Sequence, residues 1–103
     1  MPTLAEKLEA VLASGQDTAV LRFSLGNAYL ATDSAQAARH FTRATELDPQ
    51  YSAAWKMLGK ALTEAARASE AIAAFTQGIT VATAQGDVQA AKEMTVFLKR
   101  LRR

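Results

Sequence analysis

The sequence predicts an all-α protein built from six antiparallel helices. Alanine supplies much of the 50% of residues that are hydrophobic, and alanine has the highest intrinsic helix propensity because it loses no side-chain entropy. The 103 residues include only two prolines, Pro2 and Pro49, so little breaks a helical stretch. Apolar side chains also recur at the three- and four-residue spacing of a helix, in two stretches that resemble each other.

The sequence predicts both where the first helix begins and where it ends. Thr3 and Glu6 form a capping box, in which each side chain accepts a hydrogen bond from the other residue's backbone amide. Ser14 and Gly15 end this helix. Its predicted apolar face consists of Leu4, Leu8, Val11 and Leu12.

Later helices are expected to begin at aspartates, because a carboxylate there accepts hydrogen bonds from free backbone amides. The second helix begins at Asp17 or Thr18, and another begins at Asp48, with Pro49 as its first helical residue. The four aspartates interpreted as caps are Asp17, Asp33, Asp48 and Asp87. Capping explains them without a pair of acid–base carboxylates.

Two stretches of the chain repeat each other. The interval from Gly26 to Gly59 is one position shorter than the interval from Phe41 to Phe75. Both stretches carry a small–large–small stripe at helical spacing, namely Ala37, Phe41 and Ala44 in one and Ala71, Phe75 and Gly78 in the other. A glycine on the preceding helix lets such a ring approach closely, since no Cβ lies in the way.

These residues resemble the tetratricopeptide repeat, a helix–turn–helix unit of about 34 residues with the pattern W-x2-L-G-x2-Y, then A-x3-F, then P. The second stretch carries Trp55, Leu58, Gly59, Ala71 and Phe75, with Leu62 where tyrosine is usual. The first carries Leu25, Gly26, Tyr29, Ala37, Phe41 and Pro49, but has Arg22 at the tryptophan position. The resemblance covers about residues 19–83. It implies a right-handed superhelix with Trp55 packed in its core.

The flanks extend this pattern into a single domain over residues 1–103. Leu8 precedes Gly26 by the same interval by which Phe41 precedes Gly59, so residues 1–16 are expected to form the second helix of a truncated repeat. Repeat 1 then spans 17–49, repeat 2 spans 50–84, and 86–103 form a capping helix. The capping helix has Glu93 in the register of the repeat's glycine, and its apolar stripe consists of Ala90, Met94, Phe97 and Leu101.

Residues suited to catalysis or to metal binding are scarce. The absence of cysteine excludes disulfides, thiolate zinc sites and a cysteine nucleophile. His40 is the only histidine, and we interpret it as a partly exposed helix residue rather than a ligand. No glycine-rich phosphate loop follows a strand pattern. We therefore expect a non-enzymatic protein with no metal and no cofactor.

In tetratricopeptide repeats, one face of the first helix of each pair lines a concave groove that receives partner segments. The residues on that face here are Phe23, Asn27, Leu30, Lys56 and Lys60, with Thr63 beside them. The resemblance implies a protein or peptide partner. From the residues themselves, Lys56 and Lys60 suit an acidic group of that partner, and Phe23 with Leu30 suits an apolar anchor. Asn27 matches the asparagine of a carboxylate clamp that some relatives use, but Phe23 stands where the clamp lysine would be. An equal alternative is that a terminal helix covers Phe23 and Leu30.

The basic C-terminus permits another function. Lys99, Arg100, Arg102 and Arg103 turn an otherwise acidic chain into one of net charge +2. These cations suit the negative end of a helix dipole, and without interleaved aromatics they disfavour nucleic acid as the partner. An accessory role on nucleic acid or an anionic membrane stays open, as does that of an enzyme subunit that needs a partner. Without a secretory signal or a membrane-spanning stretch, a cytoplasmic location is expected.

Overall fold

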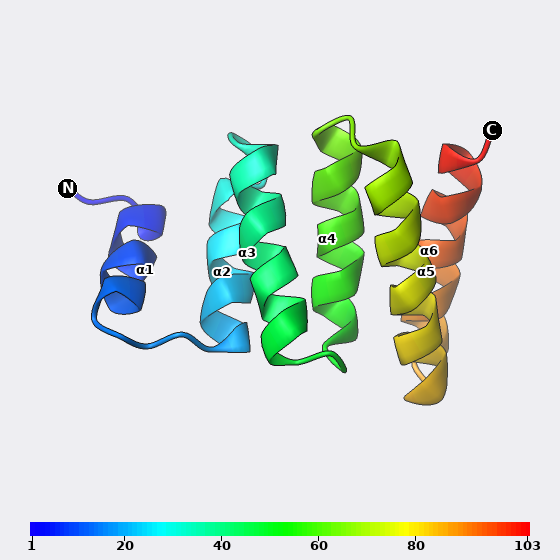
Figure 1. Cartoon of the computed structure of the whole chain (residues 1–103), viewed down its shortest axis with the longest axis horizontal. Coiled ribbons are helices and arrows are strands. Elements are labelled where there is room, and N and C mark those ends of the chain that lie inside the picture. The colour runs from blue at the N-terminus through cyan, green and yellow to red at the C-terminus, as the bar shows by residue number, and fades with distance from the viewer.

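The computed structural model describes residues 1–103 and contains six α-helices and no strand. They run in one row from the N-terminus to the C-terminus, and successive helices alternate in direction (Figure 1). This confirms the predicted all-α architecture of six helices. The helices are α1 (Leu4–Ala13), α2 (Ala19–Tyr29), α3 (Ser34–Leu47), α4 (Ser52–Glu64), α5 (Ala68–Ala84) and α6 (Val88–Leu101).

Side-chain caps begin four of these helices. The predicted capping box is present: Thr3 Oγ1 accepts from Glu6 N at 3.1 Å, and Glu6 Oε1 accepts from Thr3 N at 3.2 Å. Asp33 and Asp87 cap α3 and α6 as expected, each accepting from a backbone amide at 3.1 Å. For α2, Thr18 provides the cap.

The predictions for Asp17 and Asp48 as helix caps are wrong. Asp17 instead forms ion pairs with Arg22 and Arg43, because both guanidinium groups reach it from neighbouring helices. The side chain of Asp48 accepts from Gln50 N at 3.1 Å, which closes a local turn instead of starting a helix. Helix α4 begins only at Ser52, so Pro49 is not its first residue.

The six helices form two layers with different spacing. The backbone of α4 packs against those of both α2 and α6, whereas the backbones of α1, α3 and α5 do not approach one another. The α2–α4–α6 layer is therefore the inner, concave side of the array, and the other layer is the outer side. The whole array is 42 Å long.

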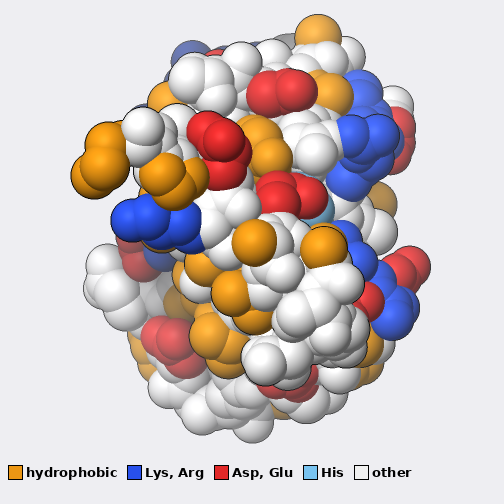
Figure 2. All heavy atoms as spheres, turned by 90° about the vertical axis from the view of Figure 1, so that its left-hand side faces the viewer, with side chains coloured by type: hydrophobic (Ala, Val, Ile, Leu, Met, Phe, Trp, Pro, Cys, Tyr) orange, Lys and Arg blue, Asp and Glu red, His pale blue; other side chains and the backbone are white.

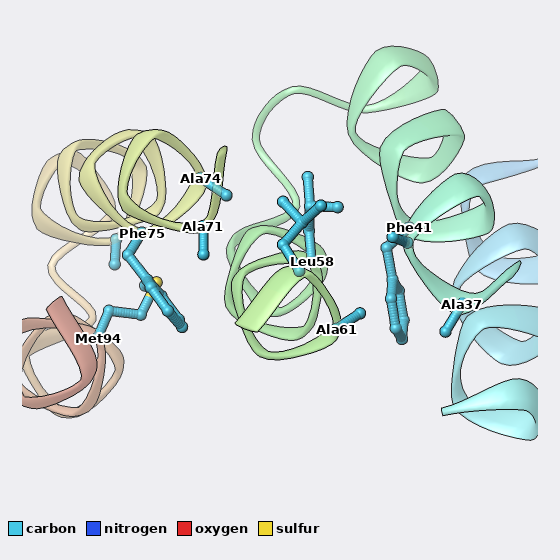
Figure 3. Close-up of a cluster of buried hydrophobic side chains, with 11 residues drawn as sticks. Ala37, Phe41, Leu58, Ala61, Ala71, Ala74, Phe75 and Met94 are labelled. Carbon is cyan, nitrogen blue, oxygen red and sulfur yellow. The ribbon is translucent and has the colours of Figure 1, made fainter. Parts of the chain in front are cut away.

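A glycine–aromatic contact joins the helices of both central pairs. A Cβ placed on Gly26 would lie 2.5 Å from the Phe41 ring, and one on Gly59 would lie 2.5 Å from the Phe75 ring. Both phenylalanines are fully buried. Figure 3 shows Phe41 and Phe75 in equivalent places of successive pairs, together with the small side chains that pack around them. These contacts confirm the close approach that the two glycines predict.

The ends of the array are packed differently. In α6, Met94 is fully buried and points toward Phe75 (Figure 3), and the rest of the predicted stripe packs against the same core. No residue of α1 is buried. The predicted apolar face of α1 is half correct, because Leu8 and Leu12 are half-buried while Leu4 and Val11 remain exposed. One neighbouring helix is too few to cover both sides of that stripe.

Candidate functional site: the concave face

The five residues predicted to line the groove all lie on the inner layer. Phe23 and Asn27 lie on α2, Leu30 directly follows it, and Lys56 and Lys60 lie on α4. Because α2 and α4 are in contact, their exposed faces adjoin. The five side chains nevertheless have different surroundings.

The two apolar side chains of this surface, Phe23 and Leu30, pack in part against other residues of the chain. Phe23 is half-buried, stacked on Tyr51 with ring centroids 4.9 Å apart and edge-on to Phe41 at 5.7 Å. Burial raises the pKa of Tyr51, the residue just before α4. Leu30 is also half-buried and packs against the core. Tyr51, which is not part of a terminal helix, therefore covers part of the Phe23 ring.

Asn27 is the most accessible member of the predicted site. Its side chain is exposed, and its amide can both donate and accept hydrogen bonds. It lies one residue after Gly26, whose own position is fixed against Phe41. The amide of Asn27 is therefore exposed on a part of α2 that packs closely against α3.

The two lysines of the site both contact side chains of α6. Lys56 Nζ lies 3.8 Å from Glu93 Oε1, so its charge is partly neutralised. Lys60 Nζ lies 5.7 Å from the centre of the Phe97 ring, and Arg100 Cζ lies 5.8 Å from the same centre. Both distances suit cation–π attraction. Lys60, Phe97 and Arg100 thus form one cluster, which we call the cationic cluster.

Sequence reasoning missed two members of the cationic cluster. It assigned Phe97 only to the core and Arg100 only to a basic tail. A signal was available, since Glu93, Phe97 and Arg100 follow one another at +4 and +3 and so share a helix face. Phe97 stacks on Phe75 with ring centroids 5.4 Å apart. A hollow of about 80 Å³ beside them is lined by these two rings with Lys60, Thr63 and Glu64.

His40 departs from its predicted exposure. It is only 5% exposed, because α1 and α2 pack over this part of α3. Arg22 Nη1 lies 3.1 Å from His40 Nδ1, and Glu9 Oε1 lies 3.3 Å from His40 Nε2. Burial lowers the pKa of His40, which favours the neutral ring. Since Arg22 can only donate, we assign the ring proton to Nε2, facing Glu9.

Arg22 connects His40 to an ion-pair network. Its guanidinium donates two hydrogen bonds to Asp17, at 2.7 and 3.1 Å. These bonds hold the pKa of Asp17 below its usual range. Arg22 stands at the position where the repeat pattern has tryptophan. In the second pair, Trp55 is half-buried rather than a full core residue, because its indole Nε1 reaches out to donate to the Pro49 carbonyl at 2.9 Å.

The structure also bears on metal binding and on membrane crossing. No group of three or more histidine, cysteine, aspartate or glutamate side chains is placed to hold a metal ion. None of the helices combines the length and the apolar character that crossing a membrane requires.

Comparison with known proteins agrees with the helical architecture. No family model matches this sequence. A TPR repeat-containing protein of Pseudomonas aeruginosa is 52% identical over 97% of this chain and 96% of its own length. The solution structure of a Bordetella parapertussis protein superposes with a TM-score of 0.84 and 42% identity, covering all of this chain and 90% of that one. At this identity and coverage, the chain belongs to the tetratricopeptide-repeat family.

Proposed function

We propose that this chain is a protein-interaction module that holds a short segment of a partner in the groove along α2, α4 and α6. The observation that carries the proposal is the cationic cluster. Lys60 and Arg100 converge on one aromatic ring of the inner layer, and neither forms an ion pair, whereas Lys56 does. An uncompensated pair of cations beside apolar surface favours an acidic segment with an apolar anchor.

Each groove residue has a role in this proposal. Lys60 and Arg100 receive a carboxylate of the partner, from an acidic side chain or a chain terminus. Asn27 exchanges hydrogen bonds with the partner backbone. The exposed parts of Phe23 and Leu30 receive the apolar anchor. Lys56 Nζ lies within 3.8 Å of a carboxylate oxygen of α6, so it contributes less charge than Lys60.

The size of the groove bounds the affinity. Only three helices line it, and two of its apolar side chains are already half-buried. An interface of this extent lies at the low end for specific complexes, so we expect dissociation constants on the order of micromolar.

Two experiments together test this proposal: selection of peptides that bind the chain, and mapping of the surface that they bind. Peptides selected from a displayed random library for binding to the whole chain should be enriched in acidic residues beside an apolar one. Titrating one such peptide into isotope-labelled protein should shift the NMR signals of α2, α4 and α6 more than those of α1, α3 and α5.

A pair of charge reversals isolates the groove. Lys60→Glu with Arg100→Glu should weaken the selected peptide at least about tenfold, which corresponds to about 1.4 kcal/mol. Arg102→Glu with Arg103→Glu makes the same change in net charge beyond the end of α6 and should alter affinity less than about twofold. The opposite ranking would assign binding to the basic tail and would remove the groove from the proposal.

A further inference from the structure

The C-terminal end of the array has a vacant position in its outer layer. Helix α2 contacts both α1 and α3, and α4 contacts both α3 and α5, but α6 contacts α5 alone among the outer helices. In the row of Figure 1, the side of α6 turned away from α4 has no further helix beside it. A helix that packed there would continue the alternation of the array.

A groove marks this vacant position. A hollow of about 600 Å³ lies between α5 and α6, lined mainly by Ile79, Val88, Ala91 and Val96. Val88 is 60% exposed and Val96 is 48% exposed. Threonines and Lys92 form the rest of the lining. Two exposed valines on the same helix, both lining one hollow, form an unpartnered apolar face.

The N-terminal end offers a helix with a matching face. Leu4 is 63% exposed and Val11 is 38% exposed, and their separation by two helical turns places them on one side of α1. Leu8 and Leu12, on the adjoining part of the same stripe, are half-buried, and α2 is the only helix whose backbone packs against α1. Figure 2 shows this end of the molecule, where hydrophobic and acidic side chains lie next to one another.

Charge distinguishes between the possible pairings of the ends. Residues 88–103 carry five cations and one glutamate, whereas α1 carries two glutamates and one lysine. Two C-terminal ends would repel each other across a symmetric contact, since like charges would face each other. The C-terminal end and α1 carry net charges of opposite sign and therefore attract.

We propose that the groove between α5 and α6 receives α1 of a second copy of this chain. The incoming helix lies antiparallel to α6, as every successive pair of helices in the array does. Val11 of the second copy then covers Val88, and Leu4 covers Val96. Glu6, in the first turn of α1, approaches the cations at the C-terminal end of α6.

This contact joins unlike ends, so it is heterologous and can repeat from copy to copy. An end face of 28 × 18 Å gives a total interface on the order of 1,000 Å² at most, at the lower limit for specific association. The assembly is therefore weak and depends on protein concentration.

Sedimentation velocity of the whole chain from about 10 μM to about 1 mM tests the contact. The mean sedimentation coefficient should rise steadily with concentration. Val96→Glu should block the groove, and Leu4→Glu should block α1, so each variant should sediment as a monomer over this range. Val20→Glu is the matched control, because Val20 is a 66% exposed valine that lines neither the groove between α5 and α6 nor the hollow beside Leu4. This variant should associate like the original chain.

Mixing the two blocked variants is the decisive arm. Val96→Glu retains its α1 and Leu4→Glu retains its groove, so the mixture should form dimers and nothing larger. Circular dichroism of each variant checks that the helices remain. A chain that stays monomeric throughout, a mixture that forms no dimer, or variants that still associate alone would each overturn the proposal. Capture of an unrelated acidic helix by the groove, without self-association, would overturn it as well.

Discussion

The helix pairs α2–α3 and α4–α5 share one contact and differ in another. Both pairs are joined by a glycine that faces a buried phenylalanine, with the same 2.5 Å distance from the hypothetical Cβ to the ring. At equivalent positions of the repeat, the first pair has Arg22 in a polar network and the second has Trp55, an indole that donates to the Pro49 carbonyl. The glycine–phenylalanine contact therefore determines how a pair packs, while the neighbouring position accepts quite different chemistry.

Removing either phenylalanine should have the largest effect on stability. Phe41→Ala and Phe75→Ala each delete a buried ring and leave a cavity between two helices, so each should lower the free energy of unfolding by about 3–5 kcal/mol. Urea titration followed by circular dichroism measures both values. Losses that differ by more than about twofold would show that the two contacts are not equivalent in energy.

Substitutions at Arg22 and Trp55 should compare how much the polar contacts of the two helix pairs contribute to stability. The substitution keeps the aliphatic stem but leaves the buried Nδ1 of His40 without its donor, which costs about 1–3 kcal/mol. Trp55→Phe removes a single neutral hydrogen bond at a half-exposed edge and should cost about 0.5–1.5 kcal/mol. Urea titrations of the two variants give the comparison. An unchanged free energy of unfolding for Arg22→Met would mean that the polar network does not stabilise the first pair.

Alanine at either glycine should be destabilising despite its helix propensity. The added Cβ overlaps the facing ring, and overpacking of this kind costs about 1–3 kcal/mol, of which alanine's preference for a helix offsets up to about 1 kcal/mol. With the full offset, we expect a net loss of up to about 2 kcal/mol for Gly26→Ala, measured by urea titration.

A double-mutant cycle sharpens this comparison. Phe41→Leu should relieve part of the loss caused by Gly26→Ala, because the leucine side chain leaves room for the Cβ. Phe75→Leu, in the other pair, should add to that loss independently. Equal coupling to both phenylalanines would indicate that Gly26→Ala disturbs the whole array rather than one contact.

The repeat register could be predicted because it depends on local spacing. Gly26 and Gly59 have aromatic partners that the repeat period identifies, and the structure confirms those contacts. His40 could not be placed this way, because its burial depends on Glu9 of α1 and Arg22 of α2. Spacing within one helix gives no information about such cross-helix ion pairs.

Only part of the candidate site could be predicted, because residue spacing gives information about one helix at a time. The spacing of α2 and α4 residues identifies which side chains share a helix face, and Asn27 and Lys60 do lie on the two adjoining helices α2 and α4. It does not reveal that Glu93 lies 3.8 Å from Lys56 or that Phe97 lies beneath Lys60. Those contacts depend on how α6 is rotated, and α6 lacks the glycine that sets the rotation of the earlier helices.

The smallest expected effect is a pH dependence confined to the first pair. Burial lowers the pKa of His40 below its ordinary value of 6.5, so the folded protein binds that proton less readily than the unfolded chain does. Stability due to the neutral ring is then fully present above about pH 6.5 and declines as the pH falls below it. Thermal unfolding monitored between about pH 7.5 and pH 5 should show a decreasing melting temperature.

Several charges surround His40 and act in opposite directions. Glu9 on α1 favours the protonated ring, whereas Arg22 on α2 and Arg39 on α3 itself oppose it. Protonation of Nδ1 would also set an N–H against the Arg22 guanidinium, which lies 3.1 Å away and has no acceptor to offer. The neutral ring is therefore the form that fits the folded protein.

His40→Gln should flatten the stability profile in this pH window, because the amide side chain does not titrate. It should leave the loss of stability at lower pH, where the carboxylates of Asp17 and Glu70, both with lowered pKa values, take up protons. Since Ala74 occupies the position of the second pair that corresponds to His40, that pair has no group that titrates there. An unchanged slope in His40→Gln would assign the pH dependence to groups outside the first pair.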